Sequence, residues 1–222
     1  MLRVSHSRLK PGRCPGYDHG PRQVEIATFA LGRFPVTNGQ FATFMAATRY
    51  RPEDSHNFLR HWENGSPPAD KRSHPVVWVS PRDAEAYLQW AGLRLPTDLE
   101  WQWAALGDTG DRWPWGPNFL AGHCNPGGAG TTPVDAFPQG AAASGCLDLV
   151  GNTWEWTGPE YDDGWHQWRL IRGGSYFRAA GSKWYVDGGL QPANMHQRFL
   201  LQGEGLNRCA TVGFRAAGEI VT

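Results

Sequence analysis

The chain has no long run of apolar residues. None of its 222 residues belongs to a stretch that approaches the roughly 20 consecutive apolar residues of a membrane-spanning helix. The N-terminal stretch, MLRVSHSRLKPGRCPGYDHG, also has no apolar core of the kind that marks a secretory signal peptide. We therefore expect no membrane partner and a cytoplasmic location.

The sequence also has no excess charge of either sign and no closely spaced cysteines. Lys plus Arg and Asp plus Glu each number 21, so the formal net charge is zero and we expect no nucleic-acid partner. Cys14, Cys124, Cys146 and Cys209 are widely spaced, which disfavours a zinc ribbon or a thioredoxin-type site. In a reducing compartment we expect free thiols rather than disulfides.

Glycine, proline and tryptophan are abundant instead. The chain has 28 Gly, 17 Pro and 12 Trp, a composition that favours many turns pinned by large aromatic side chains. Helix start signals recur three times, with Thr37 or Asn38, Ser80 and Thr97 as the predicted N-caps. Apolar residues follow each cap at helical spacing, so three helices are predicted in the first half of the chain.

Strand-like patterns and long irregular segments make up the rest of the chain. Alternating β-forming residues predict strands within 24–37, 168–177 and 210–220. The segment 107–147 is nearly all small, polar, Gly and Pro residues, and 178–207 is a second long segment. Early helices followed by short strands and long loops predict the α+β class.

The predicted domain organisation is simple. Residues 1–22 are basic and are broken by Pro and Gly, so we expect an N-terminal arm. Residues 23–222 are expected to form a single domain, because their length suits one hydrophobic core and no periodic repeat divides them.

Six motifs occur in order along nearly the whole chain. They are RFPVTNGQF, HPVVWVSPRDAEAYLQWAGLRLPTDLEWQWAA, TPVDAFPQG, LDLVGNTWEWT, RLIRGGSYF and ATVGFRAA. Together they resemble the formylglycine-generating-enzyme (sulfatase-modifying factor) family. The resemblance implies a C-type-lectin-like α+β fold with little regular structure. Because that family includes copper-dependent oxidases, iron-dependent sulfur–carbon bond-forming enzymes and pure binding scaffolds, the resemblance does not fix the function.

The sequence departs from that family at the catalytic cysteines. Formylglycine synthesis needs a Cys pair shortly after GGSY, since thiolates are the ligands that suit Cu(I). Here Phe177 and Arg178 stand where the first Cys would lie, and Cys209 is out of register with the second. We therefore do not expect formylglycine synthesis through the usual copper site. Arg178 favours an anionic group there instead.

Histidines are the remaining candidates for a metal or acid–base role. His196 lies in the segment that replaces the family's active-site loop, and together with His166 it is the best candidate, against the more frequent case of an ordinary polar loop residue. His56 and His61 are five apart, which is not one helical face. They could still meet Glu63 in a loop, but we expect both to be solvated loop residues. Iron-dependent members of the family take their three His ligands largely from a separate helical domain, for which these residues leave no room.

A pocket is predicted next to the GGSY turn. Trp184, Tyr185 and Asp187 could line it, with the carboxylate orienting a cationic ligand, or the two rings could pin the loop to the core. The predicted catalytic residues are thus His196, His166 and Tyr185. The predicted ligand-binding residues are Arg178, Trp184, Asp187 and Tyr176.

The resemblance also implies a structural calcium site in DLVGNTWEW. In the family this stretch binds Ca²⁺ through a side-chain oxygen at the Asp148 position, the carbonyls at Gly151 and Thr153, and the Glu155 carboxylate. Ca²⁺ takes six to eight hard oxygen ligands, so these donors are of the right chemical type. Asp148 stands where the family usually has Asn, which keeps the oxygen and adds a charge.

Two functions therefore remain open. The first is a divergent metal-dependent oxidoreductase, using Fe or Cu on a small-molecule or peptidyl substrate. The second is a non-catalytic module that binds a ligand or a protein, favoured by the missing Cys pair and His triad. A partner protein or a second subunit is a possible source of further site residues.

Overall fold

The computed structural model of the chain describes residues 2–4, 7–9, 24–178 and 189–220. Its α-helices are α1 (Asn38–Thr48), α2 (Pro81–Trp90), α3 (Asp98–Leu106) and the single turn α4 (Glu204–Asn207). Its strands are β1 (Leu2–Val4), β2 (Ser7–Leu9), β3 (Val24–Ile26), β4 (Phe29–Leu31), β5 (Trp154–Trp156), β6 (Tyr161–Asp162), β7 (Gln167–Arg172), β8 (His196–Leu200), β9 (Val212–Phe214) and β10 (Ala217–Glu219). Two short 3-10 helices are Ala69–Lys71 and Pro138–Gly140.

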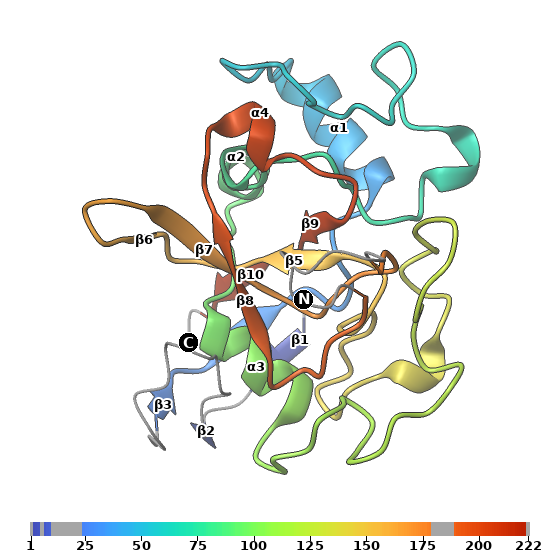
Figure 1. The fold of residues 1–222 in the computed structure, drawn as a ribbon, viewed down its shortest axis with the longest axis vertical. Coiled ribbons are helices and arrows are strands. Elements are labelled where there is room, and N and C mark those ends of the chain that lie inside the picture. The colour runs from blue at the N-terminus through green and yellow to red at the C-terminus, as the bar shows by residue number, and fades with distance from the viewer. Residues whose placement is uncertain (1, 5–6, 10–23, 179–188, 221–222) are drawn as a thin grey trace.

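The strands form three small sheets. The largest runs β6-β7-β5-β9, with β8 also paired to β7, and in it β5 and β9 are parallel. A second sheet has the order β1-β4-β10, and the third pairs β2 with β3. In Figure 1, α1 and α2 lie above the central strands and α3 lies below them, while the long irregular segment that follows α3 occupies one side. This mixture confirms the predicted α+β class.

Each predicted helix start is confirmed. Thr37, Ser80 and Thr97 are the N-caps of α1, α2 and α3, and each forms a full capping box with the residue three positions later. In α2 this partner is Asp83, whose carboxylate accepts from the Ser80 backbone N–H at 2.8 Å. These local signals fix the helix starts because they satisfy backbone N–H groups that have no partner inside the helix.

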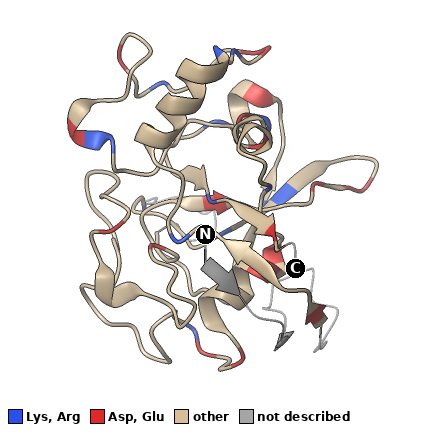
Figure 2. Ribbon diagram, turned by 180° about the vertical axis from the view of Figure 1, so that it is seen from behind, with Lys and Arg blue, Asp and Glu red and all other residues tan. Residues whose placement is uncertain are grey.

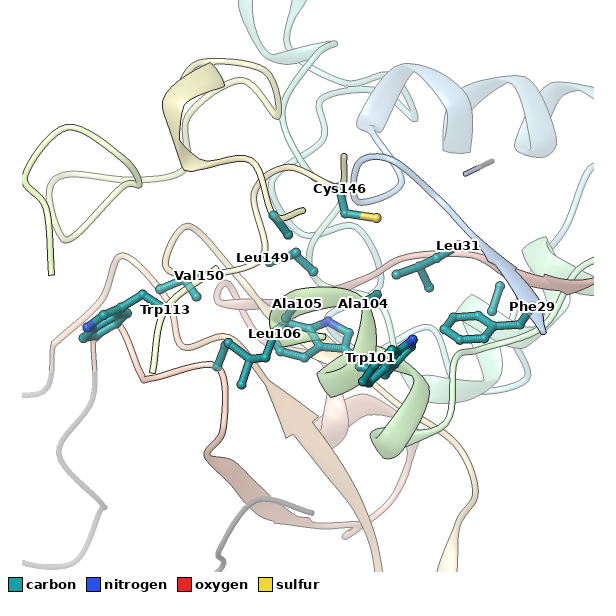
Figure 3. Close-up of a cluster of buried hydrophobic side chains, with 14 of the residues drawn as sticks. Phe29, Leu31, Trp101, Ala104, Ala105, Leu106, Trp113, Cys146, Leu149 and Val150 are labelled. Carbon is teal, nitrogen blue, oxygen red and sulfur yellow. The ribbon is translucent and has the colours of Figure 1, made fainter. Parts of the chain in front are cut away.

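Two hydrophobic clusters form the core. One surrounds α3 and is centred on the fully buried Trp101, which Figure 3 shows among Phe29, Leu31 and Leu106. The other lies between α1, α2 and the large sheet and contains Phe41 and Trp156 among its buried members. Large rings therefore supply much of the core volume, as the tryptophan content predicts.

Three buried ion pairs connect segments that are far apart in the sequence. Three arginines with less than 2 % exposure each make a two-pronged contact with a carboxylate at N–O distances between 2.6 and 3.1 Å. The pairs are Arg172 with Asp98, Arg208 with Asp83, and Arg215 with Glu155.

The same guanidinium groups also donate to carbonyls of irregular segments. The acceptors are Ala193 and Met195 for Arg172, Asp54 and His56 for Arg208, and Gly32, Arg33, Leu147 and Asp148 for Arg215. A buried carbonyl needs a hydrogen-bond donor, and in these loops the arginine side chains supply the donors that neighbouring strands supply in a sheet. They explain how a chain with so little regular structure keeps a defined fold.

Three expectations need correction. Part of the predicted arm, at β1 and β2, pairs with β4 and β3, so those residues belong to the sheets; residues 10–23 lie outside the described part. The segment 178–207 contains β8 and α4 and is not wholly irregular. The predicted strand 210–220 is two strands, β9 and β10, which join different sheets.

Charge is spread over the molecule. Figure 2 shows Lys and Arg positions interspersed with Asp and Glu positions along the ribbon. Across the described ranges, no helix is both long enough and apolar enough to span a bilayer.

Candidate ligand-binding site

The stretch 148–156 is a tight turn leading into β5. Asp148, Gly151 and Asn152 all have a left-handed backbone, with φ of 55°, 77° and 56°. A Cβ on Gly151 would lie 2.3 Å from the Asn125 carbonyl oxygen, so only glycine fits there. The fully buried Asn152 amide bonds to Thr132, Asn125 and Asp148 and ties the turn to the irregular segment.

Glu155 is committed to a buried ion pair. Its Oε2 accepts from Arg215 Nε and from Trp101 Nε1, both at 2.6 Å, and its Oε1 accepts from Arg215 Nη2 at 2.6 Å. A cation bound to this carboxylate would lie against a buried guanidinium. The arrangement therefore does not fit Glu155 as a calcium ligand, because its lone pairs serve Arg215 and Trp101 instead.

Asp148 is in a different environment. Its carboxyl is buried and accepts one hydrogen bond, from Asn152 Nδ2 at 2.7 Å. Burial raises the pKa of Asp148 to about 8, Asn152 opposes this shift and the nearby Glu155 adds to it. A carboxyl held in this way gains from a cation, so Asp148 and the carbonyls of Gly151 and Thr153 stay a prediction for calcium.

His166 and His196 do not lie together. His166 is 64 % exposed at the tip of the β6–β7 hairpin, next to a cavity of about 320 Å³ and the 90 % exposed Trp165. His196 pairs with Arg172 at the opposite end of β7. Arg172 lies six residues after His166, or roughly 20 Å along the strand, so the two imidazoles cannot share a metal ion.

His196 lies instead against a buried ion pair. Its Nδ1 is 3.3 Å from Asp98 Oδ1, close enough for an ion pair. Burial alone would raise the pKa of Asp98, but Arg172 and His196 outweigh it and hold that pKa well below its usual range. His196 is therefore packed beside the Asp98–Arg172 ion pair and does not face an open site.

The turn after β7 brings the other predicted residues to the surface. Phe177 and Arg178 are exposed, and Tyr176 is half-buried with its hydroxyl 3.5 Å from the Ala210 carbonyl. Trp184, Tyr185 and Asp187 lie outside the described residues. Tyr176 is thus the predicted ligand-binding residue that the structure places in a cavity wall.

That cavity is slightly smaller than the hairpin cavity but more enclosed. It has a volume of about 300 Å³, which lies at the lower limit of small-molecule pockets. Its walls come from α1, the segment 61–78, the loop 129–131 and the turns at 176 and 210. The lining residues are Asn38, His61, Pro68, Lys71, Pro75, Val77, Trp78, Ala129, Gly130, Thr131, Tyr176 and Ala210.

His61 is the buried titratable group of the cavity. The Asn38 amide N–H₂ donates to the carbonyls of Lys71 and Pro75, which fixes the Asn38 oxygen as an acceptor. That oxygen lies 3.0 Å from His61 Nε2, so Nε2 carries the hydrogen. Nδ1 is then a buried acceptor that has no hydrogen-bond partner among the described residues. Burial and the neighbouring Lys71 lower the pKa of His61 to about 4, so it is neutral at pH 7.

Trp78 forms a strained wall of the same cavity. Its φ of 57° is unusual for a bulky residue and costs about 1–3 kcal/mol. Hydrogen bonds hold it on both sides, from its N–H to the Cys209 carbonyl at 3.0 Å and from the Leu59 N–H to its own carbonyl at 3.0 Å. Strain of this kind gathers at ligand sites, where the surrounding structure enforces it.

Metal-ligating side chains are sparse in the part of the chain that the structure describes. There, no three His, Cys, Asp or Glu side chains gather as a group that could hold a metal ion. The described cysteines are Cys124, Cys146 and Cys209, and all three are free thiols.

The comparison with known proteins accounts for the fold. A family model described as the sulfatase-modifying factor enzyme 1-like domain matches residues 5–220. The chain belongs to this family. A formylglycine-generating enzyme of Mycobacterium tuberculosis is 32 % identical over 220 residues, covering 72 % of this chain and 71 % of that protein. An inactive C-alpha-formylglycine-generating enzyme 2 of Bos taurus is 33 % identical over 211 residues, covering 72 % and 70 %.

Other sulfatase-modifying-factor relatives match more partially. A hercynine oxygenase of Mycobacterium tuberculosis is 34 % identical over 162 residues, covering 60 % of this chain and 38 % of that protein. Two solved structures share the fold across 99 % of this chain. They are CarF, with a TM-score of 0.71 and 22 % identity over 98 % of its chain, and Treponema denticola variable protein 1, with 0.69 and 20 % over 95 %.

This divergent family member carries site residues that sequence reasoning missed. His61 was expected to be a solvated loop residue, and that expectation is wrong because the residue is packed against α1. The sequence around Lys71 and Trp78 did not predict a site, since the cavity that they line also needs the distant loop 129–131. Trp78 belongs to the family-like motif HPVVW, which is the one hint that the sequence offered.

Proposed function

We propose that this protein binds a small molecule or a short peptide segment in the cavity between Trp78 and Tyr176, as a ligand-binding module on the sulfatase-modifying-factor fold. One observation carries this proposal. The cavity combines a strained aromatic wall, a buried histidine nitrogen with no partner among the described residues and the Tyr176 turn that follows β7. Convergence of a few polar groups in an otherwise apolar cavity is typical of ligand sites.

The replacement of the family's cysteines supports a binding role. Phe177 and Arg178 occupy the position of the first family cysteine and are exposed beside the cavity's Tyr176. The similarity to a relative named an inactive formylglycine-generating enzyme also favours a member without that chemistry. The fold alone does not decide between these roles.

A test by nuclear magnetic resonance follows directly. Titration with a library of small aromatic fragments should shift the backbone amides of residues 129–131 and the indole N–H of Trp78. If instead the fragments shift only the indole of the exposed Trp165, at the hairpin cavity, the proposal is wrong. The two indoles in one sample serve as matched reporters of the two cavities.

Metal-dependent oxidation is the second candidate. Its support is the similarity to a formylglycine-generating enzyme and to a hercynine oxygenase. The match spans 38 % of the latter. The described residues hold no group of three His, Cys, Asp or Glu side chains that could bind a metal ion, so a metal site would need ligands from other residues or from a partner protein. Iron or copper in stoichiometric amount after purification without chelator, together with oxygen consumption, would favour oxidation. A protein free of both metals that still binds fragments would favour the binding module.

Two further proposals concern a bound calcium ion and the cellular location. A calcium ion at Asp148 and the carbonyls of Gly151 and Thr153 is supported by the buried, protonation-prone Asp148 carboxyl. Calcium should then raise the melting temperature of the wild type and not that of Asp148→Ala, whereas equal effects on both would contradict it. A cytoplasmic location is proposed from the sequence and is tested by tagging and fractionation.

A further inference from the structure

We propose that the Trp78–Tyr176 cavity takes a small acid, a ligand with one anionic oxygen group joined to a flat apolar part. This inference rests on the proposed binding function and names the chemical class of the ligand. Three features of the cavity carry it: the charge of its walls, the state of His61 and the apolar part of its lining.

The described walls carry one full charge at neutral pH, and it is positive. Among the lining residues that the structure describes, none is Asp or Glu and Lys71 is the one Lys or Arg. Lys71 forms no salt bridge with any residue that the structure describes. After burial, its ammonium helps to lower the pKa of His61 and of His74, and at His74 the neighbouring Asp70 partly opposes that effect. An anion is the ligand group that this positive charge attracts.

The loop opposite Lys71 suits the same anion. A Cβ on Gly130 would lie 3.9 Å from Lys71 Nζ, so this backbone faces the ammonium at close range. The Thr131 hydroxyl lies 3.0 Å from His74 Nδ1, at the edge of the cavity. Backbone N–H groups and a hydroxyl beside an ammonium are the usual donors for a carboxylate or a phosphate.

Part of the lining is apolar. Pro75 and Val77 are buried lining residues, and the aromatic residues Trp78 and Tyr176 line the same cavity. At about 30 Å³ for each water-sized group, a volume of about 300 Å³ holds roughly ten such groups, the size of a benzene ring with a short acidic substituent. His61 also lines the cavity and is neutral at pH 7, so it adds no charge of its own beside Lys71.

Three probes of one shape test this class. Phenylacetate carries a carboxylate, phenylacetamide is its neutral counterpart, and phenyl phosphate carries the alternative anion. We expect phenylacetate or phenyl phosphate to bind at least about tenfold more tightly than phenylacetamide, with shifts at the amides of 129–131. The tighter of the two anions identifies the acid, and either one supports the inference.

Variants of Lys71 test whether its charge causes the preference for anions. Lys71→Gln should remove the preference for the anion, and Lys71→Arg should keep it. Arg72→Gln removes the same charge from the neighbouring exposed residue and should leave the preference unchanged. Lys71 forms no salt bridge with a described residue, so the melting temperature of Lys71→Gln should match that of the wild type. If Lys71→Gln is less stable, Lys71→Arg still tests whether a positive charge at this position sets the preference for anions.

The outcomes separate the two proposals. Equal binding of phenylacetate and phenylacetamide in the cavity would overturn the acid class and keep the binding function. An anion preference that persists in Lys71→Gln would also overturn the inference, because the attraction would then come from another group. If no probe shifts the cavity amides, both the inference and the proposed function fall.

Discussion

Removal of the Arg172 side chain should be among the most damaging single changes in this protein. Arg172 is fully buried and donates to both oxygens of Asp98 at 2.6 Å, to Gln102 and to the carbonyls of Ala193 and Met195. Arg172→Met fills similar volume but leaves a buried carboxylate without its cation. Breaking one partner of such a pair costs about 3–5 kcal/mol, a large share of the roughly 5–15 kcal/mol that stabilises a domain.

Urea denaturation measures this loss, and an exposed arginine provides the control. Arg82 pairs with Glu204 at 3.3 Å, but its side chain is 73 % exposed, so Arg82→Met should cost less than about 1 kcal/mol. The double variant Asp98→Asn/Arg172→Met removes both charges and should lose less than the sum of the two single variants. A loss below about 1 kcal/mol for Arg172→Met, or strict additivity in the double variant, would refute the role given to this pair.

The same pair makes a prediction for pH. The pKa of Asp98 is depressed in the folded state, so the pair's stabilisation is present above the ordinary carboxyl pKa, about 4, and is lost as pH falls below it. The free energy of unfolding of the wild type should therefore fall steeply below about pH 4. Asp98→Asn should show a shallower fall, and an unchanged slope would contradict the assignment.

Three further predictions follow from single positions. Gly151→Ala should lower the free energy of unfolding by several kcal/mol, because its Cβ would lie 2.3 Å from the Asn125 carbonyl oxygen. Gly164 has a similar φ but open space around it, so Gly164→Ala should cost about 1–2 kcal/mol. Equal losses in the two variants would contradict the steric explanation. Thr97→Ala should cost about 1 kcal/mol in urea denaturation by removing the N-cap of α3, and Thr97→Ser should restore it. The pKa of His61 is lowered in the folded state, so its contribution to the free energy of unfolding is complete above about pH 6.5 and is lost as pH falls toward 4. His61→Asn should therefore make the free energy of unfolding depend less on pH in that window. An unchanged pH dependence would refute the burial of a neutral ring.

Local signals in the sequence were sufficient for the helices and for the family. Thr37, Ser80 and Thr97 could be identified as caps because a capping box needs only residues three positions apart. The ordered motifs predicted the family and the α+β class, and both are confirmed.

Long-range partners could not be predicted in the same way. The family resemblance implied that Glu155 holds calcium, but it gave no sign of its ion pair with Arg215, which lies 60 residues later. The burial of His61 depends on Asn38, and the cavity depends on the approach of loop 129–131 to the segment 61–78. Such contacts depend on how distant loops pack, which no local pattern encodes.

A crystal structure of the protein soaked with phenylacetate is the most direct test of the binding site. We expect the ring to lie between Trp78 and Tyr176 and the carboxylate to lie within hydrogen-bond distance of Lys71 Nζ. Density for the ligand in the hairpin cavity beside Trp165, or an empty Trp78–Tyr176 cavity at a concentration that saturates binding in solution, would contradict the proposed site.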